Sequence, residues 1–309
     1  MRYVVTGGAG FIGSHLVEHL VRAGDDVTVL DDLSTGKREN LAPWKSSIRF
    51  IEGSITDPVA CARAISGSNV VLHQAALPSV PRSVADPLGS HAVNATGTLN
   101  VLIAARDARV ERVVYAASSS AYGDTPELPK HEGMVPCPRS PYATAKLAGE
   151  EYCRAFHASY GVPTVSLRYF NVFGPRQDPA SAYAAVVPKF IAAALANTAP
   201  VIYGDGEQTR DFTYVENVVR ANLAACTAPE RALGEAFNIG CGDRVSVNAL
   251  WDRVRALTGA TTAPRHEPAR AGDVRDSLAS VSRASECLAW SPTIDLDEGL
   301  RRTLAAARA

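Results

Sequence analysis

The sequence predicts an α/β protein in which a doubly wound parallel sheet is followed by a smaller mixed α/β domain. Short β-branched runs alternate with amphipathic stretches through the first half of the 309 residues. Such alternation is typical of right-handed βαβ units with helices on both faces of the sheet. The predicted strands are 4–5, 27–30, 48–51, 70–72, 113–115 and 164–168. The predicted helices between them are 12–23, 56–66, 90–108 and 142–160.

The pattern changes after about residue 170, where loops become frequent. Pro141 suits the first turn of the helix 142–160, and Gly161 suits its C-terminal end. Beyond it, the predicted helices are 184–197, 215–227, 246–258 and 282–288. We therefore predict one domain over 1–170 and a second over 171–309, with part of 211–240 packing back on the first.

The composition is that of an ordinary globular protein, with 46% apolar and 20% charged residues. Lysine plus arginine (31) balance aspartate plus glutamate (32), so the chain lacks the basic footprint of a nucleic-acid binder. The six cysteines show no zinc-site spacing, and we expect no metal. There is no apolar run long enough for a membrane span, and the start does not resemble a signal peptide. We therefore expect a cytoplasmic protein with no membrane partner.

A glycine-rich turn follows the first strand and opens the first helix. Gly8, Gly10 and Gly13 satisfy G-x-G-x-x-G, and Gly7 adds a second reading of the motif. Glycines there permit a tight turn and let the backbone approach a pyrophosphate, which the helix N-terminus also attracts. In this strand–turn–helix context the motif predicts a Rossmann-like dinucleotide site.

An aspartate ends the second predicted strand. Asp31 comes 18 residues after Gly13, where a carboxylate would bind the adenosine ribose hydroxyls. The same charge would repel a 2′-phosphate, so NAD is favoured over NADP, although the nearby Lys37 and Arg38 leave NADP open. A solvated loop pair is the alternative for Asp31 and Asp32. We interpret Asp57, before Pro58, as a helix N-cap.

Two motifs carry possible chemistry. Tyr142 and Lys146 lie four residues apart, on one helical face, and an ammonium near a phenol favours the phenolate. A proton acceptor near neutral pH needs that help. The serines 118–120 follow a strand, where hydroxyls would lie in the ligand crevice. Tyr-x-x-x-Lys alone is common on surface helices, but its order with the serines and the glycine turn is specific.

With these motifs the chain resembles the extended short-chain dehydrogenase/reductases, and within them the UDP-hexose 4-epimerases. The resemblance covers the whole length. It is carried by TGGAGFIG (6–13), HQAA (73–76), SSSAYGD (118–124), YATAK (142–146), RYFNVFGPRQDP (168–179) and GDGEQTRDFTYV (204–215). The branch acting on UDP-N-acetylhexosamines is the most similar, through residues 73–83 and 176–190.

The resemblance implies a role for each site residue. Tyr142 would be the acid/base, Lys146 would bind the nicotinamide ribose, and Ser118, with Ser119 as its rival, would contact the sugar 4-hydroxyl. The implied cofactor-binding residues are Gly7, Gly10, Phe11, Ile12, Gly13, Asp31, Asp32, Ser54, Ile55, Gln74, Ala75, Ala76, Asn94, Tyr142, Lys146 and Tyr169. The implied substrate-binding residues are Ser118, Ser119, Asn171, Val186, Arg210, Arg270, Asp273 and Ser277.

The implied reaction is NAD-dependent 4-epimerisation of a UDP-sugar through a transient 4-keto sugar. Arg210 and Arg270 would bind the diphosphate, and Asp273 the uridine ribose. Ser277 would stand beside the sugar C2 substituent, where a small residue leaves room for an acetamido group. UDP-N-acetylglucosamine and its galactosamine epimer are therefore expected as substrates beside UDP-glucose and UDP-galactose.

Three alternatives stay open. A 4,6-dehydratase or a decarboxylase of the same family would carry a carboxylate after Ser118, where this chain has Ser119 and Ser120. A uronate 4-epimerase is harder to exclude, although 176–183 does not match its usual sequence. A non-catalytic NAD-binding module would tend to lose the tyrosine or the lysine. The resemblance also implies a homodimer joined through the two long helices.

Overall fold

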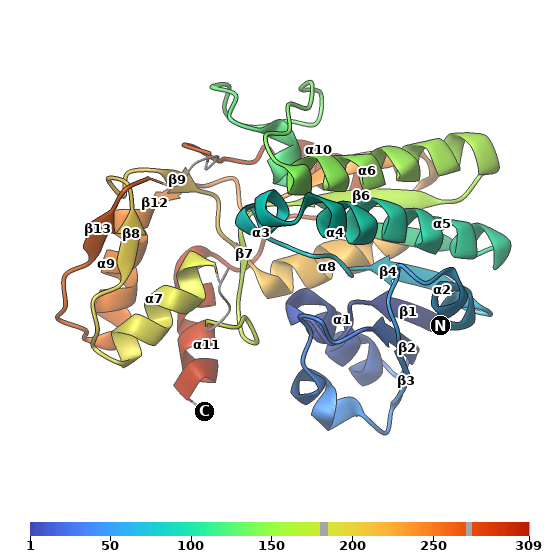
Figure 1. Cartoon of the computed structure of the whole chain (residues 1–309), viewed down its shortest axis with the longest axis horizontal. Coiled ribbons are helices and arrows are strands. Elements are labelled where there is room, and N and C mark those ends of the chain that lie inside the picture. Colours follow the sequence, from blue (N-terminus) through green and yellow to red (C-terminus); the bar gives the residue numbers. More distant parts are fainter. Residues whose placement is uncertain (180–184, 270–273, 309) are drawn as a thin grey trace.

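A seven-stranded parallel sheet forms the centre of the computed structural model, which describes residues 1–179, 185–269 and 274–308 (Figure 1). Its strands are β1 (Arg2–Thr6), β2 (Asp26–Asp31), β3 (Ile48–Glu52), β4 (Val70–His73), β5 (Arg112–Ser118), β6 (Thr164–Tyr169) and β11 (Glu235–Ile239). They lie in the order β11-β6-β5-β4-β1-β2-β3. Val5 pairs with Val29 on one side and with Leu72 on the other. Apolar runs form these strands because a parallel sheet is covered on both faces.

Helices cover both faces of this sheet, which confirms the predicted doubly wound fold. On one face α1 (Phe11–Arg22) and α8 (Val215–Cys226) pack together over the strands. On the other face lie α2 (Pro58–Ile65), α5 (Thr98–Asp107) and α6 (Pro141–Tyr160), and α5 runs beside α6 (Figure 1). Ser140 caps α6 by accepting a hydrogen bond from the Ala143 amide, and Gly161 ends it in a left-handed conformation.

The predicted helix 90–108 is divided in the structure. It consists of α4 (Pro87–His91), a π-helical turn (Ala92–Gly97) and α5. The Thr98 hydroxyl donates to the carbonyl of Asn94 inside the π turn, at 2.8 Å. A side-chain donor of this kind satisfies a backbone acceptor in a helix whose regular bonding is interrupted.

The remaining elements are shorter and lie mostly beyond the first half. The helices are α3 (Val80–Ala85), α7 (Val186–Leu195), α9 (Val247–Thr258), α10 (Ser282–Leu288) and α11 (Leu296–Arg308). The 3-10 helices are Arg38–Trp44, Ser119–Tyr122 and Glu230–Ala232. The small strands pair as β7 (Val172–Phe173) with β10 (Thr213–Tyr214), β8 (Val201–Tyr203) with β13 (Arg265–Glu267), and β9 (Thr209–Arg210) with β12 (Val245–Ser246). An apolar cluster that includes Phe190, Trp251 and Leu300 joins α7, α9 and α11.

Two elements from the second half of the chain pack with the first half: a strand of the large sheet and a helix that covers it. β11 pairs with β6, and α8 packs against α1 and β5. The strand β11 and the helix α11 were not predicted from the sequence. The domain boundary at residue 170 stays a prediction.

Asp57 caps α2 as predicted, because its carboxylate accepts a hydrogen bond from the Val59 amide. Among the described residues, no helix is both long and apolar enough to span a bilayer.

Candidate active site

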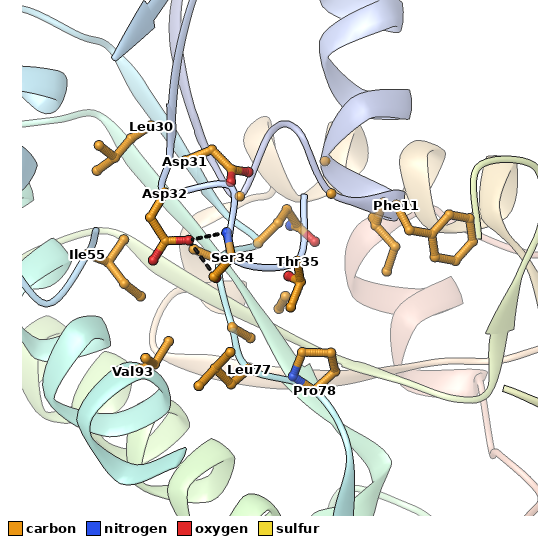
Figure 2. Close-up of a pocket in the computed structure, with 18 of the residues that line it drawn as sticks. Phe11, Leu30, Asp31, Asp32, Ser34, Thr35, Ile55, Leu77, Pro78 and Val93 are labelled. Carbon is orange, nitrogen blue, oxygen red and sulfur yellow. Dashed lines mark hydrogen bonds between the residues drawn. The ribbon is translucent and has the colours of Figure 1, made fainter. Parts of the chain in front are cut away.

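A cavity of about 240 Å³ opens at the carboxyl ends of the central strands. The strand order reverses between β1 and β4, which is where open α/β sheets bind their ligands. Many of its lining residues are site residues that the sequence predicted (Figure 2). These are Gly7, Gly10, Phe11, Ile12, Gly13, Asp31, Asp32, Ile55, Gln74, Ala75, Ala76, Tyr142, Lys146 and Tyr169.

The glycine turn lies tightly against the start of α1. Gly7 has a positive φ of 69°, and its amide donates to the Leu30 carbonyl at 2.8 Å. A Cβ atom on Gly13 would lie 2.1 Å from the Gly7 carbonyl oxygen, so a larger residue cannot replace Gly13 without moving the turn. The cavity is therefore bordered by backbone and by a helix N-terminus, which suits a pyrophosphate.

Asp31 is held rigidly at the end of β2. Its carboxylate accepts hydrogen bonds from the amides of Ala9 at 2.9 Å and Leu33 at 2.8 Å. Burial raises the pKa of Asp31, and these two amides oppose that shift. Asp32 accepts from the Ser34 amide and hydroxyl beside it (Figure 2). Two carboxylates at this end of the cavity fit the ribose hydroxyls of a dinucleotide.

Lys37 and Arg38, the two cations that could have bound the 2′-phosphate of NADP, form ion pairs with other residues. Lys37 forms an ion pair with Asp178 at 2.8 Å. Arg38 pairs with Glu52, and its guanidinium lies 4.8 Å from the centre of the Phe50 ring. Neither lines the cavity among the described residues, so the adjacent charge is that of the carboxylates. This charge fits NAD.

Two predicted cofactor contacts lie outside the cavity lining. The Asn94 side chain accepts from the Leu77 amide at 2.9 Å and donates to the Leu77 carbonyl at 3.0 Å. Leu77 lines the cavity, so Asn94 acts through it. The Ser54 hydroxyl accepts a hydrogen bond from Thr56, while Ile55 beside it lines the cavity.

Ser118 contacts Tyr142, which lines the first cavity, although neither Ser118 nor Ser119 is among the residues lining either cavity. Ser118 ends β5 and begins the 3-10 helix that contains Ser119, accepting from the amide and hydroxyl of Ser120 at 3.2 and 2.8 Å. A hydrogen bond joins the side chains of Ser118 and Tyr142. This contact favours Ser118 over Ser119 as the partner of the phenol.

The expected electrostatics of the tyrosine and the lysine differ in the structure. Burial raises the pKa of Tyr142, and its hydrogen bond with Ser118 opposes this. Burial also lowers the pKa of the Lys146 ammonium to about 7. Its Nζ lies over the ring of Tyr115, 4.3 Å from the ring centre. The lysine is therefore poised between its charged and neutral forms rather than acting as a fixed cation.

The sequence analysis did not single out several residues that line the first cavity or contact its lining. Asn222 of α8 donates to the Tyr169 hydroxyl at 2.8 Å and accepts from the Gln74 amide group at 3.0 Å. The missed lining residues are Leu30, Ser34, Thr35, Gly53, Leu77, Pro78, Val93, Ala116 and Ala117. Most of these directly follow or precede predicted site residues, which is the signal that could have found them. Asn222 lies far from them in the sequence and had no such signal.

A second cavity of about 390 Å³ adjoins the first along the chain. Leu77 and Pro78 line the first cavity, and 79–81 line the second. The predicted substrate residues Asn171, Val186 and Arg210 line it. So do Tyr203, Gln208 and Phe212, which the sequence did not single out.

The other predicted substrate residues are placed differently. Ser277 donates its amide to the Thr209 carbonyl at 3.1 Å, next to Arg210, and is not among the residues lining either cavity. Arg270 and Asp273 lie outside the described residues. His73 is a packed strand-end histidine, as predicted, bonded to Thr6 and Thr98.

The fold and the first cavity are those of a dinucleotide-binding protein, and comparison with known proteins identifies its family. The model of the NAD dependent epimerase/dehydratase family matches residues 3–240. The chain belongs to this family. NAD is its cofactor, and the glycine turn and Asp31 fit that group.

Similar proteins agree with this assignment along the whole chain. A UDP-glucose 4-epimerase from Mycolicibacterium smegmatis is 40% identical over 98% of this chain and 97% of its own length. The structure of a UDP-glucose 4-epimerase with UDP-glucose from Thermotoga maritima matches with a TM-score of 0.95 and 40% identity, covering 100% of this chain and 99% of that one. A UDP-N-acetylglucosamine 4-epimerase from Methanobrevibacter ruminantium, in complex with UDP-N-acetylmuramic acid, matches with a TM-score of 0.94 and 39% identity, covering 99% and 98%.

Some relatives with lower identity are named for other sugars. A UDP-glucuronate 4-epimerase from Thermodesulfobacterium geofontis and a UDP-N-acetyl-alpha-D-glucosaminuronate decarboxylase from Bacillus cytotoxicus are each 33% identical to this chain. Membership of the family therefore leaves the sugar open.

Proposed function

We propose that the chain is a UDP-hexose 4-epimerase, acting on UDP-N-acetylglucosamine and UDP-N-acetylgalactosamine as well as on UDP-glucose and UDP-galactose. The observation that carries this proposal is the hydrogen bond between Ser118 and Tyr142, because Tyr142 and Lys146 line a cavity that adjoins a second one. A phenol and a hydroxyl together can hold and exchange the proton of one sugar hydroxyl. They would do so at the cavity proposed to hold the nicotinamide.

The residues of the first cavity bind and orient the cofactor. The glycine turn would hold the pyrophosphate, Asp31 the adenosine ribose and Lys146 the nicotinamide ribose. NAD bound there would supply reversible hydride transfer at C4 of the sugar. Tyr142 would accept the proton of the 4-hydroxyl as the sugar is oxidised to its 4-keto form, and would return it later. Ser118 would hold the reacting oxygen in place.

The residues of the second cavity would hold the UDP group. Arg210 supplies a planar guanidinium that matches a diphosphate, and Asn171 lies beside it with its amide group donating to the Asp211 carbonyl at 3.3 Å. Val186 adds an apolar wall. Arg270 and Asp273 belong to the same proposal. Because the sugar would be held through UDP, it could turn between the two hydride transfers.

Ser277 is proposed to set which sugar fits. Its amide is bonded to Thr209, and two residues earlier the Arg275 amide donates to Asp124 at 3.1 Å. The segment therefore runs between the strand that carries Arg210 and the loop that follows Ser118. A small residue there leaves room for an acetamido group, whereas a large one would exclude it.

Elimination of water or carbon dioxide is less well supported by the site. Ser119 and Ser120 follow Ser118, with no carboxylate among them. In the described part of the first cavity the lining carboxylates are Asp31 and Asp32, both at the end of β2. Dehydration needs an acid near the sugar, and these lie at the predicted adenosine end. A UDP-glucuronate 4-epimerase would share the same chemistry, so it is an outcome of the test below.

We further propose a homodimer in the cytoplasm, joined through α5 and α6. These neighbouring helices expose apolar side chains, with Ile103 37%, Tyr152 38% and Tyr160 57% accessible. Leu88 of α4 is 83% accessible and extends the same group of helices. Burying such side chains against a second copy would stabilise a dimer. Sedimentation should show twice the mass of the chain, and a monomer at micromolar concentration would contradict this.

The reaction itself is tested by incubating the purified protein, without added cofactor, with each candidate UDP-sugar. We expect each of UDP-glucose, UDP-galactose and their N-acetylamino forms to give its C4 epimer. UDP-glucuronate should stay unchanged. Conversion of UDP-glucuronate alone would replace this proposal by the uronate activity, and loss of water or carbon dioxide would exclude epimerisation as the function.

A further inference from the structure

Tyr115 lies directly beneath Lys146 and contacts it twice. It stands on β5 and is fully buried. Its ring centre is 4.3 Å from the Lys146 ammonium, and its hydroxyl donates to the Lys146 backbone carbonyl at 3.1 Å. One side chain thus holds both the charged end and the backbone of the lysine.

The packing around Tyr115 keeps its ring in this place. A Cβ atom on Gly149 would lie 2.3 Å from the Tyr115 hydroxyl, so the absence of a side chain there lets the hydroxyl approach α6. On another side the His73 ring lies 5.5 Å away, centre to centre. His73 is itself bonded to Thr6 at 2.7 Å and to Thr98 at 3.1 Å.

The charged groups near Lys146 do not replace the interaction between the Tyr115 ring and the Lys146 ammonium. Burial lowers the pKa of Lys146 to about 7, and Cys153 and Glu150 of the same helix oppose this. Glu150 is shared with Arg168 of β6, which it binds at 2.6 and 2.9 Å. His73 of β4 is neutral near pH 7, because burial and then the nearby ammonium lower its pKa to about 3. The face of the Tyr115 ring therefore stabilises the Lys146 ammonium, because the nearby carboxylate of Glu150 is bound to Arg168.

We propose that Tyr115 is a positioning residue that seats Lys146 against the cofactor cavity, the ring face stabilising the ammonium and the hydroxyl fixing the helix backbone. The face of an aromatic ring is negative and attracts a cation, more strongly where water is excluded. The importance of Lys146 for the reaction rests on the proposed function. The contact between Tyr115 and Lys146 does not depend on that function.

If the Tyr115 ring stabilises the ammonium, replacing it should change the pKa of Lys146, which a tyrosine that only fills space would not do. Because the ring favours the charged form of Lys146, its removal should make the ammonium lose its proton at a lower pH. Lys146 would then be mostly neutral at pH 7. Tyr142, whose pKa burial raises, would then have a neutral lysine one helical turn away on α6.

The test measures the protonation of Lys146 directly in the full-length protein. The chain has five lysines, so ¹³C-lysine labelling gives few NMR signals, and Lys146→Met identifies the relevant one. Tyr115→Phe keeps the ring, so Lys146 should titrate within a few tenths of a pH unit of the unmodified protein. Tyr115→Leu removes the ring and should lower the titration midpoint by roughly one unit.

A second series keeps the shape of the side chain in case Tyr115→Leu does not fold. Phenylalanines carrying increasing numbers of fluorine atoms, incorporated at position 115, withdraw the negative charge of the ring face while filling the same space. The Lys146 midpoint should fall with each added fluorine. Tyr122→Phe is the matched control, because it removes another buried hydroxyl, which donates to Asn238 at 2.7 Å, and should leave the midpoint unchanged.

The outcomes separate this inference from the proposed function. A Lys146 midpoint that does not move across the fluorinated series overturns the inference, whatever the enzyme does with UDP-sugars. A falling midpoint in a protein that epimerises none of them supports the inference and contradicts the function. With both intact, the fall of turnover at high pH should begin at a lower pH in Tyr115→Leu than in Tyr115→Phe.

Discussion

The two cavities are built in different ways. The first is formed by the ends of long parallel strands, where backbone amides hold Asp31 and glycines bring the turn against α1. The second is lined from two- and three-residue strands, from α7 and from α9, which lie far apart in the sequence. The difference indicates that the sheet provides the site common to the family. If the second cavity holds the UDP group, as we propose, the short elements determine which molecule binds.

Tyr142→Phe should have the largest effect, because it removes the proton acceptor and leaves both cavities intact. Turnover should fall by about 10³-fold or more, while bound NAD, measured after heat release, stays unchanged. Tyr152→Phe on the exposed side of the same helix is the control and should keep full turnover. A Tyr142→Phe protein with more than a tenth of the normal rate would mean that another group moves the proton.

Gly13→Ala should damage the first cavity alone. The new Cβ would lie 2.1 Å from the Gly7 carbonyl oxygen, so the turn must move away from α1. We expect the free energy of unfolding to fall by about 1–3 kcal/mol and the protein to lose NAD during purification. Gly133→Ala, at an exposed loop position, should change neither. Retention of NAD by Gly13→Ala would show that the turn adapts more easily than this packing suggests.

Ser277→Tyr should act on the choice of sugar. Turnover of the N-acetyl sugars should fall by about 10²-fold because a phenol ring occupies the space for the acetamido group. UDP-glucose and UDP-galactose should still react. Ser285→Tyr, on an exposed face of α10, is the control for a surface tyrosine. Equal losses on all four sugars would mean that Ser277 does not determine which one fits.

Arg210→Ala should weaken the second cavity and spare the first. Loss of a charged hydrogen-bonding group to a diphosphate should raise the KM for UDP-sugars by about 10-fold or more. The amount of bound NAD should not change. Arg265→Ala removes an exposed arginine that pairs with Glu267 outside both cavities and should leave KM unchanged. If Arg210→Ala lost NAD as well, the two cavities would not be independent.

Patterns within short stretches of sequence predicted much of the first cavity. Six of the seven sheet strands, the glycine turn and the helix with Tyr142 and Lys146 could be recognised in this way. The seventh strand, β11, was missed because its sequence, EAFNI, has no run of β-branched residues. It becomes a strand by pairing with β6 at the edge of the sheet. Asn94 stays a predicted cofactor contact. In the structure its amide group is bonded to the backbone of Leu77, which lines the cavity.

The sequence by itself determined the glycine turn, the carboxylate after the second strand and the spacing of Tyr142 and Lys146, because these depend on neighbours along the chain. Only the tertiary structure decided that Ser118 contacts Tyr142, that Asn222 is bonded to Tyr169, and that Lys146 lies over Tyr115 with its pKa near 7. Burial and contacts between distant strands create those properties. Neither can be read from spacing, since both depend on which parts of the chain exclude water from one another.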